Sequence, residues 1–275
     1  MNKPAQVPED VQGVLEIRDP AIDADVVDGL ELTFSRPAGV ITARLVLDAR
    51  NSSWAAMLMS QSIALHGGES AAWYEAMNAD TLAARRAEER IASEAFLRVS
   101  VWDGRSWRAQ GRIREAGPEV AKRQVHGLDL GAVPGDVVRV RLESAPSLWL
   151  IDRVALDPSP AAGGVTMSEP LRMVQARDGA GTDVAGRLAR ADAAYLSLEP
   201  GDSAFVAFAD LPAPGPARVR SYVARTTGWY RVHGPESGEP DRETLARLAR
   251  DPHAIGRISV ERINQALHAL AAVKP

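Results

Sequence analysis

The chain of 275 residues contains no cysteine. Disulfides, thiolate catalysis, zinc–thiolate sites and iron–sulfur clusters are therefore excluded within it. It also has no run approaching the roughly 20 apolar residues of a membrane-spanning helix, so we expect no transmembrane segment. The opening residues 1–8 lack the apolar core of a signal peptide. That fits both a cytosolic start and a start from which a signal has been removed.

A concentrated basic segment is missing as well. The formal net charge is −4 and the charges are spread along the chain, whereas nucleic-acid binding needs clustered lysine and arginine. We therefore expect no nucleic-acid partner. Hydrophobic residues make up 45% and charged residues 25% of the sequence, as in a globular protein with one large domain or two ordinary ones.

Two segments of the sequence follow nearly the same pattern. Residues 128–142 and 196–208 each contain a strand pattern, a Pro-Gly-Asp turn and a second strand pattern. Proline presets the φ angle of such a turn, and glycine takes the positive φ that follows. The repeat predicts a mainly β protein with two antiparallel β-sandwich units of the jelly-roll or galactose-binding-like kind.

The turn signals also predict two domains, joined at the Pro- and Gly-rich stretch 157–164. Residues 1–157 are predicted to form one sandwich with a helical insertion at about 54–94. Residues 165–275 are predicted to form the second sandwich unit, ending in helices at about 241–272. The insertion is long for a connection between strands, which makes it a candidate recognition surface.

Several polar residues mark the predicted helix ends and faces. Asp80 and Asp241 are expected N-caps, and Ser259 is expected to begin the last helix. Arg85 and Glu89 have the spacing of an ion pair on one exposed helical face. The apolar stripe of the last helix needs a surface to cover, and we expect that surface on the same chain.

Five segments of the sequence are similar to segments of a known group of proteins. They are the stretch 43–51 with Trp54, the turn and strand 134–144, the strand 149–157, the segment 183–192 with Tyr195, and the segment 221–232. Together they resemble a group of poorly characterised bacterial, extracytoplasmic β-sandwich proteins of the galactose-binding-like kind. The resemblance implies a sandwich and a place in the cell envelope, and it implies no activity.

The aromatic residues offer one candidate ligand site. Trp102 and Trp107 flank Asp103-Gly104, which is typical of a two-residue hairpin turn, and Trp229-Tyr230 follows a glycine. Aromatic rings on a β-sandwich can stack on sugars, so a glycan is one possible partner. The alternative is that Trp102 and Trp107 only pack against each other across two strands. The candidate ligand-binding residues are therefore Trp102, Trp107, Trp229 and Tyr230.

An acidic loop offers a candidate metal site. Calcium binds several carboxylate oxygens at once, and the loop supplies four carboxylates, although their spacing matches no EF-hand. A solvated acidic loop is the alternative. No other cofactor is expected, because the Gly-rich stretch 179–186 has Val184 where a dinucleotide fingerprint needs its third glycine. The candidate calcium ligands are Asp19, Asp23, Asp25 and Asp28.

A catalytic hypothesis rests on the group His66, Glu69 and Ser70, which could serve hydrolysis with the histidine as base and the serine as nucleophile. A glycine helix stop followed by a new helix start explains the same residues. The sequence therefore favours a non-catalytic binding or assembly module with a protein partner in a bacterial envelope or a multi-subunit complex. A carbohydrate-binding module and a hydrolase remain as alternatives.

Overall fold

The structure is a computed structural model that describes residues 5–6, 26–114, 117, 121–160, 170–215, 219–228 and 233–273, with side chains omitted at 5–6, 267 and 270–273. The chain divides into two compact units. The larger unit contains residues 1–161 and 233–275, and the smaller unit contains residues 162–232. The predicted two-sandwich division at 157–165 stays a prediction.

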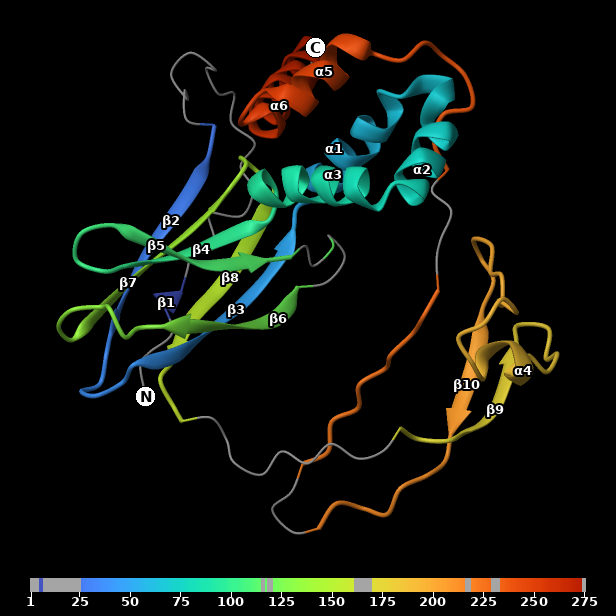
Figure 1. Ribbon diagram of the computed structural model, residues 1–275, viewed down its shortest axis with the longest axis horizontal. Helices are drawn as coiled ribbons and strands as arrows, with labels where there is room; N and C mark the ends of the chain where they lie inside the picture. The colour runs from blue at the N-terminus through green and yellow to red at the C-terminus, as the bar shows by residue number, and fades with distance from the viewer. Residues whose placement is uncertain are drawn as a thin grey trace. The chain divides into compact units, whose positions relative to one another are not determined.

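Two four-stranded antiparallel sheets form the larger unit (Figure 1). The first sheet has the order β1-β8-β3-β6, with strands at Ala5–Gln6, Trp149–Asp157, Thr42–Asn51 and Lys122–Asp129. The second has the order β2-β7-β4-β5, with strands at Asp28–Ser35, Val137–Ser144, Leu97–Trp102 and Trp107–Ile113. The predicted predominance of antiparallel β structure is confirmed, although strands only slightly exceed helices.

Alternation along the strands places one hydrophobic core between the two sheets. In β3 every second side chain is buried, including Leu45 and Leu47, and the second sheet contributes Val138 and Val140 from β7 to the same cluster. Because strand side chains point alternately to opposite faces, the intervening residues face away from this core. The outward face of the second sheet therefore carries the polar positions of β2, β7, β4 and β5.

The β4–β5 hairpin is confirmed, but its turn is longer than predicted. Trp102 is paired with Trp107, so four residues lie between the strands instead of two. The Asp103 carboxylate accepts hydrogen bonds from the backbone N–H groups of Arg105 (2.9 Å) and Ser106 (2.8 Å), which closes this wider loop. This Asp-based turn competes successfully with the expected two-residue turn.

The helical insertion lies between β3 and β4. It contains α1 (Ser53–Ala64), the short 3₁₀ turn η2 (Gly67–Glu69), α2 (Ser70–Ala79) and α3 (Thr81–Glu94). The Asp80 carboxylate accepts from the N–H groups of Leu82 and Ala83, which confirms the predicted cap. These helices gather at one end of the two sheets (Figure 1).

The C-terminal helices α5 (Arg242–Arg250) and α6 (Ala254–Val273) pack against this insertion. Asp241 caps α5 as predicted, accepting from Thr244 N–H. The prediction that Ser259 begins a helix is wrong, because Ser259 lies inside α6. Its buried Oγ accepts from Trp54 Nε1 at 2.8 Å and donates to the Pro146 carbonyl at 3.3 Å, so a tertiary contact uses the hydroxyl.

The apolar stripe of α6 covers a surface of the same unit, as expected. Ile258 and Ile263 are buried against Trp54 and Leu58 of α1 and against Leu148. The buried Glu94 at the end of α3 accepts from the N–H groups at the start of α6, at Ile255 and Gly256. A carboxylate at a helix N-terminus satisfies unpaired amides and interacts favourably with the helix dipole.

The smaller unit contains a two-stranded antiparallel sheet of β9 (Met173–Asp178) and β10 (Ala204–Phe208), with the short helix α4 (Ala185–Leu188). Ala176 and Val184 are buried together beside α4. A second sandwich over 165–275 stays a prediction, since the described residues of this unit supply two strands. In the described part of the chain, no helix is both long and apolar enough to cross a membrane.

Candidate functional site

The outward face of the second sheet brings together residues that lie far apart in the sequence. Glu31 of β2 is paired in register with Arg141 of β7, and Arg141 is paired with Ser100 of β4. Two positions further along β4 and β5, Trp102 is paired with Trp107. One face of four strands therefore presents arginine, glutamate and tryptophan side chains side by side.

The predicted aromatic pair is present on this face. The ring centroids of Trp102 and Trp107 lie 5.5 Å apart in an edge arrangement, with an angle of 61° between the ring planes. The Arg139 guanidinium lies 5.3 Å from the centroids of both rings, and that of Arg141 lies 4.1 Å from Trp107. These are cation–π distances, so the rings hold two guanidinium groups in place.

Glu31 fixes the same two arginines from β2. Its carboxylate accepts from Arg139 at 3.0 Å and from Arg141 Nε at 3.0 Å. The hydrogen bonds from Arg141, and then those from Arg139, lower the pKa of Glu31 below its ordinary value. Glu31 therefore stays ionised over the physiological range, and two cations share one anion.

Covering the indole rings with guanidinium groups changes what the pair can bind. A neutral sugar stacks on a free aromatic face, whereas here both rings already contact a cation. The guanidinium of arginine is a planar donor suited to bidentate contacts with carboxylates and phosphates. The arrangement is therefore better suited to anionic groups than to a bare sugar ring.

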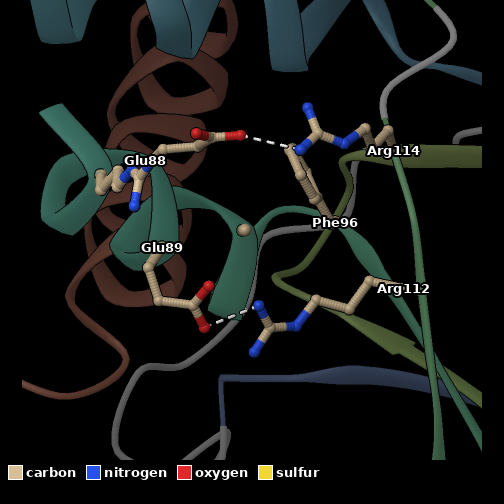
Figure 2. A pocket seen from close by; sticks show the side chains of 7 residues that line it. Glu88, Glu89, Phe96, Arg112 and Arg114 are labelled. Carbon is tan, nitrogen blue, oxygen red and sulfur yellow. Dashed lines mark hydrogen bonds and ion pairs between the residues drawn. The ribbon is translucent and has the colours of Figure 1, made fainter. Parts of the chain in front are cut away.

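A cleft of about 470 Å³ lies at the end of this face, between α3 and β5 (Figure 2). Two ion pairs cross it: Arg112–Glu89 at 2.7 Å and Arg114–Glu88 at 2.8 Å. The Arg114 guanidinium lies 5.6 Å from the ring centroid of Phe96. The cleft is lined by Arg85, Glu88, Glu89, Ala92, Phe96, Arg112 and Arg114.

The position of each ion pair follows from side-chain alternation in β5 and from two neighbouring positions on α3. Ile113 lies in the core, so its neighbours Arg112 and Arg114 both face outward toward α3. Glu88 and Glu89 are adjacent on α3 and reach across to one arginine each (Figure 2). The predicted pair of Arg85 with Glu89 is replaced by the contact of Glu89 with Arg112, because the tertiary partner faces it directly.

The three residues of the hydrolase hypothesis each have a different contact. Ser70 is buried and its Oγ donates to the Pro235 carbonyl at 3.0 Å. Glu69 forms an ion pair with Arg242 at 2.8 Å. The His66 ring stacks on Trp73 with centroids 4.4 Å apart, and burial lowers its pKa. The contacts of Ser70 and Glu69 tie the insertion to Pro235 and to the start of α5, whereas the His66 contact lies within the insertion. The catalytic role stays a hypothesis.

Of the predicted calcium ligands, Asp28 is described. Its carboxylate accepts from Ser147 N–H at 3.0 Å, which ties the start of β2 to the β7–β8 turn. Asp19, Asp23 and Asp25 lie outside the described residues. Within the described ranges, no group of three or more His, Asp or Glu side chains is arranged to hold a metal ion. Structural calcium stays a prediction.

Trp229 and Tyr230 also lie outside the described residues. Elsewhere in the smaller unit, several large apolar side chains are exposed, which was not predicted from the sequence. Phe205 and Phe208 of β10 are 70% and 54% exposed. Tyr222 and Val223 are 70% and 89% exposed. A five-residue strand, Ala-Phe-Val-Ala-Phe, with apolar residues on both faces and no polar alternation was the available signal.

Comparison with known proteins gives no relative for this chain. The sequence matches no protein-family model and no curated protein, and the structure matches no solved structure. The two candidate surfaces therefore stand on their geometry. One is the charged outer face of the second sheet with its cleft, and the other is the exposed apolar strand β10 of the smaller unit.

Proposed function

We propose that this protein is a non-catalytic binding module that assembles with a protein partner, in a bacterial envelope or a multi-subunit complex. The observation that carries the proposal is the exposure of Phe205, Phe208, Tyr222 and Val223 in the smaller unit. Phe205 and Phe208 lie on one five-residue strand, and large apolar side chains that are grouped on a protein surface are typical of binding sites. We further propose that the larger unit is a β-sandwich of the galactose-binding-like kind.

The chemistry of the expected partner follows from the strand that carries the phenylalanines. β10 is paired with β9 on one side and, among the described residues, with no strand on the other. A sheet of two strands is only marginally stable by itself. A partner that adds a strand to β10 would supply backbone hydrogen bonds, and its apolar side chains would cover Phe205 and Phe208.

The test is an affinity pull-down of the tagged full chain from soluble and envelope fractions of its own source, read by mass spectrometry. The double variant Phe205→Ser/Phe208→Ser is compared with the control Ile41→Ser/Val125→Ser. Ile41 and Val125 are exposed to a similar degree in the larger unit. A stoichiometric partner that is lost in the first variant and kept in the second supports the proposal. A partner that both variants retain contradicts the assignment to β10.

Carbohydrate binding is the second candidate, and the observation in its favour is the Trp102–Trp107 pair on an outer sheet face. Tryptophan fluorescence during titration with glycans tests it, with Trp107→Ala as the variant. Because Arg139 and Arg141 lie over the rings, we expect a response to glycans with acidic groups and little response to neutral ones.

A further inference from the structure

We propose that the outer face of the second sheet and the α3–β5 cleft form one binding strip for an acidic oligosaccharide such as a chain of uronic acids. The name "arginine strip" denotes five outward-facing side chains: Arg98, Arg112, Arg114, Arg139 and Arg141. The inference rests on the carbohydrate-binding candidate and specifies its ligand class. It does not depend on β10 or on the protein partner.

The register of the strands makes the strip continuous. Arg98 of β4 is paired with Arg112 of β5, so the arginine of the cleft has a second arginine directly beside it. Four residues along β4 separate Arg98 from Trp102, a distance of about 13 Å in an extended strand. Arg139 and Arg141 lie at the Trp102 end of that distance. The strip is therefore long enough for several linked sugars with an acid group on each.

The arginines of the strip are available to a ligand because their present partners are weakly held. The side chains of Glu88 and Glu89 are 53% and 66% exposed in their pairs with Arg114 and Arg112. Exposed ion pairs of this kind contribute little to stability. A ligand carboxylate can therefore replace either glutamate at small cost.

The mixture of charges favours a sugar acid over an acidic peptide or a neutral sugar. Glu31 and Glu143 lie among the arginines on the same face, at 3.0 Å from Arg139 and at 4.0 Å from Arg141. Such carboxylates accept hydrogen bonds from hydroxyl groups, which the side chains of a polyacidic peptide do not supply. A uronic acid chain presents both carboxylates for arginine and hydroxyls for glutamate.

The test is a calorimetric titration of the full chain with tetragalacturonic acid, with cellotetraose and a tetraglutamate peptide as comparison probes. Wild type is expected to bind the acidic sugar, less tightly as salt increases. The variant Arg112→Gln/Arg141→Gln should weaken binding roughly tenfold or more, because two charge-assisted contacts are lost. The control Arg123→Gln removes an arginine paired with Asp48 on the other sheet and should change little.

A second variant separates ligand binding from a purely structural role of the ion pairs. Glu88→Gln/Glu89→Gln removes the carboxylates that compete with the ligand, so affinity for tetragalacturonic acid should rise several-fold. Thermal unfolding of each variant checks that the fold is retained. The proposal is overturned if wild type does not bind the acidic sugar, if cellotetraose binds equally well, or if tetraglutamate binds more tightly. It is also overturned if Glu88→Gln/Glu89→Gln does not raise the affinity for tetragalacturonic acid. None of these results affects the pull-down through β10, so the two failures are distinguishable.

Discussion

Two antiparallel strand pairs, β4 with β7 in the larger unit and β9 with β10 in the smaller, differ in how their apolar residues meet solvent. Val99 and Val140 of the first pair are completely buried, whereas Phe205 of the second is 70% exposed. The first pair has a second sheet opposite its apolar face, and the two sheets share one core. In the smaller unit, α4 and Val184 cover Ala176, but Phe205 and Phe208 stay exposed. The difference in side-chain exposure therefore depends more on how much structure packs against each strand pair than on the strand sequence.

Truncating one apolar side chain in each unit should give the largest difference in stability between the two units. Leu45 is completely buried at the centre of β3, so Leu45→Ala should lower the free energy of unfolding by about 2–5 kcal/mol. Phe205→Ala should change it by less than about 0.5 kcal/mol, because the ring is mostly in water already. Urea unfolding followed by far-UV circular dichroism measures both. Equal losses for the two variants would show that Phe205 is covered within the chain.

The parts of the fold that the sequence predicted are those set by local pattern. Alternation in β3 and β7 and the caps at Asp80 and Asp241 depend on neighbouring residues, so they could be identified without the structure. Ser259 could not be assigned correctly, because its partner Trp54 lies 205 residues away in the sequence. A cap and an interior serine look alike until the distant donor is known.

In the candidate site, too, the local contacts could be predicted from the sequence and the distant ones could not. The pairing of Trp102 with Trp107 follows from a short hairpin and was anticipated as one of two alternatives. The arginines that cover the rings come from β7, and their shared carboxylate comes from β2, 110 residues before Arg141. Their meeting depends on sheet order and register, which the sequence does not specify. Charges that look evenly spread along the chain therefore become clustered only after folding.

Removing one contact that holds the C-terminal helices in the larger unit should have a smaller effect on stability. Ser259→Ala leaves the buried Nε1 of Trp54 without its acceptor, which should cost about 1–3 kcal/mol. Ser62→Ala is the matched control, because the Ser62 hydroxyl donates to the Leu58 carbonyl of its own helix. Adding Trp54→Phe to Ser259→Ala should cost less than the sum of the two single changes. Strict additivity would contradict a direct bond.

The smallest expected effect is a pH dependence confined to the larger unit, since no histidine occurs in residues 162–232. Burial lowers the pKa of His66 below its ordinary value of 6.5, while Glu69 acts weakly in the opposite direction. Below pH 6.5 the unfolded chain therefore binds more protons at this residue than the folded chain does. Stability then falls as the pH drops from 6.5 toward the folded pKa.

Urea midpoints measured above and below pH 6.5 test this for wild type and for His66→Gln, which keeps a polar side chain but cannot titrate. The loss of stability on acidification should be smaller in the variant, because its folded and unfolded states no longer differ in proton binding at position 66. Carboxylates such as Glu31, whose pKa is lowered by Arg141 and Arg139, contribute equally in both proteins at lower pH. Identical pH profiles would mean that His66 is as well solvated in the folded protein as in the unfolded chain. Its stacking on Trp73 would then be too loose to bury the imidazole ring.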